Sequence, residues 1–223
     1  MTRRWVAIAF VTGLFACGDS FAPNEGSGGA GASPTGTSAG SGAGDPGCSD
    51  GSRERYEDVG AFPDIAGCWG AWTVPGVSTP ASASPACGRE AGNSGANPAG
   101  QGCTVADLCA AGWHVCRSAV EVGADSGGVG CPPPREPPEL WLTRQTSMAM
   151  SAVCGDSDNN LVACGTMGEP ADGSCMPLER VVFFSHCDEA GWSCGTAAEG
   201  DLEAAVVTKT MPVVGGGVLC CRD

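Results

Sequence analysis

The stretch VADLCAAGWHVCRSAVEV, residues 105–122, carries the clearest local folding signals in the chain. Thr104 stands immediately before it and Asp107 follows three residues later, a capping pattern that predicts a short helix ending at the glycine of this stretch. Ser118 and Glu121 repeat the pattern and predict a second short helix. The WHV between the two helices is expected to form a buried strand.

Five later segments predict strands, because several of them are rich in β-branched residues. They are ELWLTRQT (139–146), NLVACG (160–165), LERVVFF (178–184), AAVVTK (204–209) and GGVLCC (216–221). Clusters of Gly, Ser, Asn and Pro at 75–102 and 124–138 predict long loops. Helices early and strands late favour a small α+β domain in which two short helices pack on an antiparallel sheet.

The first sixteen residues predict an export signal. Arg3 and Arg4 form a positive start, and the uncharged run that follows, WVAIAFVTGLF, is too short to span a bilayer, which takes about 20 residues. Residues 14–17, Leu-Phe-Ala-Cys, resemble the lipobox of bacterial lipoproteins. That resemblance implies cleavage after residue 16 and lipidation of Cys17, usually with a further acyl chain on the new amino terminus, which together hold a protein stably on a membrane. The alternative is an ordinary secretory signal that ends near a cysteine by chance.

Residues 17–47 predict a flexible tether, because the segment has almost no large apolar side chain after Phe21 and cannot offset the entropy of ordering. The folded domain is expected over 48–223, a single domain by its length. Gly18 stands where some lipoproteins carry the Asp that retains them at the inner membrane. We therefore expect a cell-envelope location, anchored by lipid in the outer membrane and exposed at the surface.

Fourteen of the fifteen cysteines remain once Cys17 is set aside. An even number in an exported chain predicts seven disulfides, because the compartments outside the cytoplasm are oxidising. Zinc binding is the alternative, but the chain has no Cys-x2-Cys pair, the spacing typical of tetrahedral zinc sites. The cysteines expected to pair are Cys48, Cys68, Cys87, Cys103, Cys109, Cys116, Cys131, Cys154, Cys164, Cys175, Cys187, Cys194, Cys220 and Cys221.

Residues 105–122, together with the terminal GGVLCCRD, resemble the skeleton of the C-type lectin-like fold and its formylglycine-generating-enzyme relatives. In that superfamily a Cys-bearing helix leads through a Gly to a strand and a second helix, and a last Cys-bearing strand closes the domain. The resemblance implies that Cys109 or Cys116 pairs with Cys220 or Cys221. The combination of lipobox, Gly/Ser/Ala tether and Cys-rich acidic domain also resembles surface lipoproteins of myxobacteria, which implies a location and no activity.

The resemblance does not extend to calcium-dependent sugar binding. GEPADG (168–173) offers Glu-Pro-Ala where the sugar-binding lectins have Glu-Pro-Asn, and no Trp-Asn-Asp is present. DSDNN (156–160) has the first ligand spacing of an EF-hand, but Leu161 and Met167 occupy positions that need Gly and Glu. An irregular calcium site and an Asp- and Asn-rich turn are the two interpretations of this segment, and no metal or cofactor is assigned.

Charge excludes one class of partner. The full chain has a net charge of −14, and loss of Arg3 and Arg4 with the signal takes the mature chain to about −16. Such a surface repels the phosphate backbone, so nucleic acid is not expected as a partner. Lys209 is the only lysine, and no polybasic patch for anionic lipid is present.

No catalytic residue is assigned. ADSGGVG (124–130) resembles the nucleophile motif of serine proteases, and FFSHC (183–187) faintly resembles their histidine segment. Nucleophilic catalysis needs Ser, His and a carboxylate to converge. In that family the histidine precedes the serine by a long stretch of chain, whereas His186 follows Ser126 and His114 lies only twelve residues before it. We expect 124–130 to be a flexible loop and both histidines to be structural.

Trp69, Trp72 and Trp192 could stack on sugar rings or apolar partners, but in a domain poor in aromatic residues they are expected in the core. The function that these features favour is a lipid-anchored, non-catalytic binding or adhesion module with a glycan or protein ligand. The alternatives are a surface hydrolase that uses carboxylates, which needs a cleft with a raised carboxyl pKa, and a structural protein of the envelope.

Overall fold

The computed structural model describes residues 46–223 apart from 136, 149–150, 156–158 and 196–202. The export signal, Cys17 and most of the tether lie outside the described residues. Within the described part of the chain, no helix is both long and apolar enough to cross a membrane. The domain is of the α+β class with two short α-helices and a mainly antiparallel sheet, which confirms the expected class.

The elements are short. The large sheet contains β1 (Ile65–Trp69), β2 (Trp113–Val115), β3 (Leu140–Ser147), β4 (Cys154–Gly155), β5 (Asn160–Gly165), β6 (Glu169–Pro170), β7 (Arg180–Val182) and β10 (Gly216–Arg222). A small sheet pairs β8 (Trp192–Ser193) with β9 (Thr208–Lys209). The α-helices are α1 (Ala119–Asp125) and α2 (Glu203–Val206), and the 3-10 helices are η1 (Ala81–Ala83), η2 (Val105–Leu108), η3 (Gly173–Cys175) and η4 (Phe184–Cys187).

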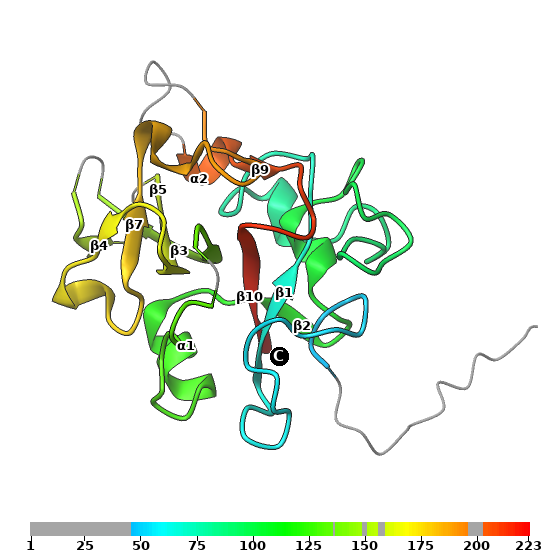
Figure 1. Ribbon diagram of the computed structural model, residues 1–223, viewed down its shortest axis with the longest axis horizontal. Coiled ribbons are helices and arrows are strands. Elements are labelled where there is room, and N and C mark those ends of the chain that lie inside the picture. Colours follow the sequence, from blue (N-terminus) through cyan, green and yellow to red (C-terminus); the bar gives the residue numbers. More distant parts are fainter. Residues whose placement is uncertain (1–45, 136, 149–150, 156–158, 196–202) are drawn as a thin grey trace, which may run out of the picture. The chain divides into compact units, whose positions relative to one another are not determined.

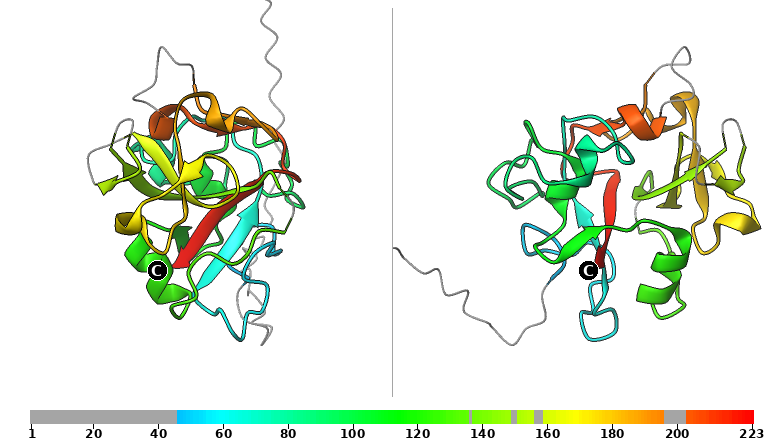
Figure 2. Two further views of the ribbon diagram at one scale, coloured as in Figure 1. Left: turned by 60° about the vertical axis from the view of Figure 1, so that its left-hand side comes forward. Right: turned by 180° about the vertical axis from the view of Figure 1, so that it is seen from behind.

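The last strand lies in the middle of the large sheet. The order is β1-β10-β3-β5-β7-β6, with β2 also paired to β10 and β4 to β3. Every pair is antiparallel except β10 with β3, which run parallel. Figure 1 shows β10 in red beside β1 in cyan, and both views of Figure 2 show the same two strands as neighbours. The carboxyl end of the chain thus connects the early elements to the later strands.

Alternating side chains give the sheet two apolar faces. Cys68 and Val218 belong to one buried cluster, whereas Ile65 and Leu219 belong to the other. Burial of both faces explains why β10 and β5 read as nearly continuous apolar runs in the sequence.

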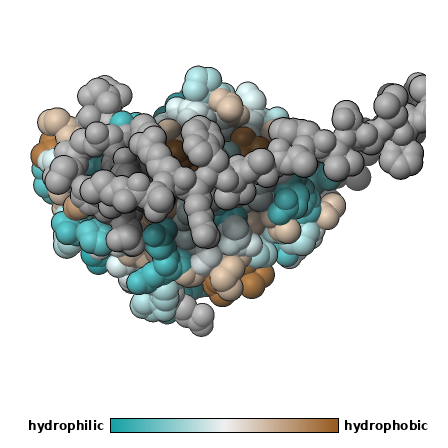
Figure 3. Space-filling model, turned by 90° about the horizontal axis from the view of Figure 1, so that it is seen from above, coloured by the Kyte–Doolittle hydropathy of each residue, from teal (hydrophilic) through white to brown (hydrophobic). Residues whose placement is uncertain are grey.

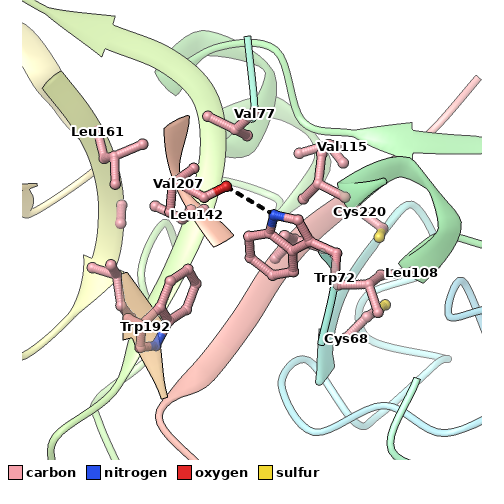
Figure 4. Close-up of a cluster of buried hydrophobic side chains, with 14 of the residues drawn as sticks. Cys68, Trp72, Val77, Leu108, Val115, Leu142, Leu161, Trp192, Val207 and Cys220 are labelled. Carbon is pink, nitrogen blue, oxygen red and sulfur yellow. Dashed lines mark hydrogen bonds between the residues drawn. The ribbon is translucent and has the colours of Figure 1, made fainter. Parts of the chain in front are cut away.

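Two tryptophans organise the first cluster, as Figure 4 shows. Trp72 and Trp192 meet edge to face with their ring centroids 5.3 Å apart. The indole N–H of Trp72 donates to the Val207 carbonyl at 3.2 Å. Both rings are buried, which confirms that these two tryptophans are core residues.

Seven disulfides cross-link the described residues, which confirms the expected number. Two of them hold β10: one joins the residue after η2 to Cys220, and the other joins the residue after β2 to Cys221. Neighbouring residues on a strand point to opposite faces, so these vicinal cysteines reach different partners. The pairs are Cys48–Cys68, Cys87–Cys103, Cys109–Cys220, Cys116–Cys221, Cys131–Cys164, Cys154–Cys175 and Cys187–Cys194.

The structure differs from the expected helices in two places. The segment after Thr104 has the capping box, but it forms only the 3-10 helix η2. Its Asp107 carboxylate also accepts backbone N–H groups of the 86–89 loop, and Cys109 takes an extended conformation toward its disulfide partner. The second α-helix instead covers Glu203–Val206, where AAVVTK predicted a strand, and only Thr208–Lys209 is extended. The pair of alanines in this segment favours the helix.

Two further differences concern the strands. The sequence did not predict β1, whose Gly67 interrupts the apolar pattern. A side chain at Gly67 would overlap Arg55, so glycine is required by the close approach of that segment. The LERVVFF segment is extended only over Arg180–Val182 and then turns into η4.

Candidate functional site

A pocket of about 390 Å³ opens where five parts of the chain meet: residues 53–57, the end of β1, the described residues of the 135–141 segment that enters β3, Ala190, and the segment 213–216 that enters β10. Its volume lies within the range of ligand sites. The large apolar side chains of its walls are Trp69, Pro137, Pro138, Trp141, Val213 and Val214. The charged side chains that line it are Arg53, Glu54, Arg55, Glu57, Arg135 and Glu139.

Strand register places two tryptophans on the same face beside the pocket. Gly217 of β10 pairs with Trp69 of β1 on one side and with Trp141 of β3 on the other. Because glycine carries no side chain, the Trp141 ring extends across β10 toward β1. Its Cε3 lies 3.1 Å from the position that a Cβ would take at Gly67.

The backbone that enters β10 approaches β3 closely at the same site. Gly216 has a φ of +85°, and a Cβ there would overlap the carbonyl oxygen of Leu140. Glycine is therefore needed both for the backbone conformation and for the contact. This close approach lets the parallel β10–β3 pair begin beside the pocket.

The charged groups of the pocket largely neutralise one another. Arg55 forms a buried ion pair with Glu139, donates to the Pro133 carbonyl at 2.7 Å, and lies 5.9 Å from the centroid of Trp141. Arg135 pairs with Glu57 nearer the solvent. The ion pair of Arg55 is shielded from water, whereas the exposed pair of Arg135 contributes little to stability.

Arg53 donates hydrogen bonds to several backbone oxygens. Its Nη1 donates to the carbonyls of Tyr56 at 3.1 Å, Phe62 at 2.7 Å and Ile65 at 3.1 Å. The guanidinium thus holds the 56–65 loop in place. Its role is to shape the wall of the pocket.

Glu54 is the carboxyl group with the most altered acidity at the site. The pKa of Glu54 is raised to about 7, mainly by burial. The charge of Asp50 also raises the pKa, whereas the hydrogen bonds from the N–H of Trp69 and the amide of Asn93 lower it because they stabilise the charged form. The two hydrogen bonds measure 2.8 Å from Trp69 N and 3.2 Å from Asn93 Nδ2. At neutral pH the pocket therefore holds a carboxyl group that is half-ionised.

Both tryptophans of the pocket wall have an indole N–H with no hydrogen-bond partner. Trp72 and Trp192, by contrast, donate to backbone carbonyls at 3.2 Å and 2.6 Å. Buried Trp N–H groups ordinarily find an acceptor. Two unsatisfied donors in one wall are thus an unusual feature of this site.

The residues of the protease-like motif do not form a catalytic group. Ser126 is buried at the end of α1, where its Oγ accepts from Gly130 N at 2.8 Å and donates to the Gly123 carbonyl at 3.3 Å. These bonds make Ser126 a residue that closes the 126–130 turn. They do not involve a histidine.

The histidines are also accounted for by local contacts. His114 has a 17% exposed side chain between two carboxylates: Nδ1 lies 2.6 Å from Asp223 and Nε2 lies 2.9 Å from Glu121. It thereby connects the carboxyl terminus to α1 across the end of the sheet. His186 is exposed in η4, where its ring meets Phe183 edge to face at 5.1 Å.

Among the residues that the structure describes, one group of side chains has the proximity that a metal site needs: Cys87, Cys103 and Asp107. The two cysteines form a disulfide. Burial opposes the charge of Asp107, but backbone N–H groups of the 86–89 loop and of Thr104 outweigh this and keep its pKa below the usual value. The group is therefore explained as a structural clamp.

The remaining sequence candidates lie away from the pocket lining or outside the described residues. Glu169 and Pro170 form β6 at the edge of the sheet. Residues 156–158 of the EF-hand-like segment are outside the described residues, and Asn160 donates to the Met148 carbonyl at 2.7 Å. Of the three tryptophans considered in the sequence, only Trp69 lines the pocket, where it is partly buried.

The sequence did not predict the pocket because its lining residues come from five distant parts of the chain. The proline-rich run 131–139 was the available signal, since prolines 137 and 138 form part of the wall. No protein-family model matches the chain, and no solved structure matches it.

Proposed function

We propose that this chain is a lipid-anchored module of the bacterial cell envelope that binds a ligand in the pocket beside Trp69 without catalysing a reaction. The lipobox-like residues 14–17 support the anchor, and the following Gly/Ser-rich segment supports a domain held away from the membrane. We place the protein in the outer membrane, exposed at the surface. The observation that carries the binding function is the pocket itself, with its apolar walls and its unsatisfied indole donors.

The C-type lectin-like fold is part of the proposal. Two disulfides support it, because Cys109–Cys220 and Cys116–Cys221 join the helix–strand region to the last strand as the resemblance implies. The adjacency of β1 and β10 also agrees with a domain that its last strand closes. Function does not follow from this fold alone, so the binding function rests on the pocket.

A surface hydrolase is the second candidate, because Glu54 has the raised pKa that a general acid requires. The other two glutamates of the lining are each paired with an arginine. Both oxygens of Glu54 also accept hydrogen bonds from the protein. These contacts favour binding over catalysis, and an envelope structural protein without a ligand is the third alternative.

Two substitutions at exposed valines test the binding function. Val213 is 51% exposed and lines the pocket, so Val213→Trp fills the pocket from its rim. Val129 is 57% exposed and is not part of the lining, so Val129→Trp is the matched control. Intact cells that carry wild-type protein or Val129→Trp are expected to capture the same envelope or extracellular ligand, and cells that carry Val213→Trp are expected to lose it.

Equal capture by all three strains would contradict the proposed binding site. Glu54→Gln separates the hydrolase from the binding module, since it removes the acid but keeps a side chain of similar shape. Retention of ligand capture by Glu54→Gln, with no turnover of the ligand by wild type, is expected.

A further inference from the structure

We infer that the pocket binds an uncharged, proline-containing peptide segment in an extended conformation. This inference rests on the proposed binding function and adds the chemical class of the ligand. Three features of the pocket carry it: its balanced charge, the shape of its apolar wall, and the kind of polar group that it leaves unsatisfied.

The charge of the pocket excludes a strongly charged ligand. The whole chain carries −14, but the lining has three arginines and three glutamates. The ion pairs Arg55–Glu139 and Arg135–Glu57 occupy four of these six groups, and Arg53 is bonded to three backbone carbonyls. An anionic ligand would have to break an existing pair, and a cationic ligand would have to do so or meet Glu54, whose two oxygens already accept hydrogen bonds from the protein; a neutral ligand needs neither.

The apolar wall suits flat rings and short aliphatic groups. Trp69 and the consecutive prolines 137 and 138 present ring surfaces, and Val213 and Val214 extend the apolar surface to the solvent. In the view of Figure 3, brown hydrophobic areas are visible as small patches among teal hydrophilic residues. Aromatic-lined grooves of this kind recognise polyproline segments, whose extended conformation is already formed before binding.

The unsatisfied polar groups decide between a peptide and a sugar. The lining residues with buried polar atoms and no partner are Trp69 and Trp141, and both atoms are donors. A proline-containing peptide supplies carbonyl acceptors and lacks an N–H at each proline. A sugar hydroxyl brings a donor together with each acceptor, and such donors would need acceptors that the pocket has already used.

The two donors differ in how easily a ligand reaches them. Both nitrogens are covered by neighbouring atoms. Trp141 is only 2% exposed and is held under Arg55, whereas Trp69 is partly buried at the end of β1. We therefore assign the ligand hydrogen bond to Trp69, whose ring has to turn on binding to present its N–H.

The test is a titration of the lipidated full-length protein in detergent micelles with a polyproline peptide blocked at both ends. Binding measured by calorimetry is expected for wild type and for Val129→Trp, and Val213→Trp is expected to abolish it. Trp69→Phe keeps a ring but removes the donor, so we expect about five-fold weaker binding, the loss of one net hydrogen bond. Thermal melts of each variant confirm that it is folded.

A neutral oligosaccharide is titrated in parallel. If it binds in a Val213-dependent manner while the peptide does not, the binding function stands and the peptide inference is wrong. If neither probe binds wild type, the peptide inference is also wrong, and the binding function is then decided by the cell-capture experiment. Equal peptide affinity of wild type and Trp69→Phe would overturn the assignment of the donor.

Discussion

The two disulfides that hold β10, Cys109–Cys220 and Cys116–Cys221, are together expected to contribute more to stability than the disulfide Cys87–Cys103. They join residues 111 and 105 positions apart, whereas Cys87 and Cys103 are 16 apart. One variant replaces all four cysteines of the β10 disulfides by alanine, and the other replaces Cys87 and Cys103 by alanine. Paired replacement leaves no free thiol to form a new bond.

The loop lengths give the magnitude. The two β10 disulfides close almost the same long loop, so either one alone keeps that loop closed and only their joint removal opens it. In the chain-entropy model, a loop of 111 residues stabilises the folded state by about 4.8 kcal/mol and a loop of 16 residues by about 3.1 kcal/mol. The expected difference between the two variants is therefore at least about 1.7 kcal/mol. Cys87 is partly buried whereas Cys109 and Cys220 are fully buried, so the cavity that is left acts in the same direction.

Guanidinium unfolding of the full-length variants measures the difference directly. We expect the variant that lacks both β10 disulfides to unfold at the lower denaturant concentration, and to lose a large part of the roughly 5–15 kcal/mol that typically stabilises a domain. A Cys87/Cys103 variant that is equally or more destabilised would refute the argument, because β10 would then be held in the sheet without its long-range cross-link.

Further predictions concern a buried amine, a glycine and the anchor. Burial lowers the pKa of Lys209 from 10.5 to about 7, so the unfolded chain binds this proton more tightly and stability rises between about pH 7 and 10.5. Unfolding measured against pH should show a rise of order 4 kcal/mol in wild type that Lys209→Met lacks, and parallel curves would exclude this cause. Gly216→Ala should cost at least about 2 kcal/mol in thermal or chemical unfolding, because the Cβ meets the Leu140 carbonyl. Gly51→Ala, with a φ of +83° and open space around it, is the control and should cost less. Cys17→Ser should move the protein from the membrane to the soluble fraction without changing its unfolding midpoint, and continued membrane attachment would contradict the lipid anchor.

Local signals in the sequence predicted much of the fold. The capping pattern of Ser118 and Glu121 predicted α1 because it depends on contacts within one turn. The Ser118 side chain accepts a hydrogen bond from Glu121 N. The largely apolar segments at 139–146 and 160–165 predicted β3 and β5, since burial of these strands requires apolar residues there. The cysteine count gave the number of disulfides because pairing depends on the compartment more than on local structure.

Features that depend on distant contacts were not predicted. The β1 strand contains Gly67, whose presence is explained only by the approach of Arg55 and Trp141. The helix α2 replaced an expected strand, because a segment with both alanines and valines carries no decisive periodicity. The parallel pairing of β10 with β3 needs both strands in place, so no short stretch of sequence indicates it.

The candidate site was predicted least. Trp69 was considered for ligand stacking, but its register with Gly217 and Trp141 arises only when β1, β10 and β3 are aligned. The pairing of Arg55 with Glu139 joins residues 84 positions apart. The raised pKa of Glu54 likewise reflects burial by tertiary packing and not its sequence neighbours.

The most direct test of the central claim is a ¹H–¹⁵N NMR spectrum of the tryptophan indole N–H groups during titration with the blocked polyproline peptide. Trp72 and Trp192 already donate to backbone carbonyls, and Trp69 does not. If the pocket binds the peptide, the Trp69 indole proton shifts downfield in a saturable manner as it gains an acceptor, and the Trp72 and Trp192 signals do not move. An unchanged Trp69 signal at saturating peptide, or a shift centred on the core tryptophans, would contradict a ligand site in this pocket.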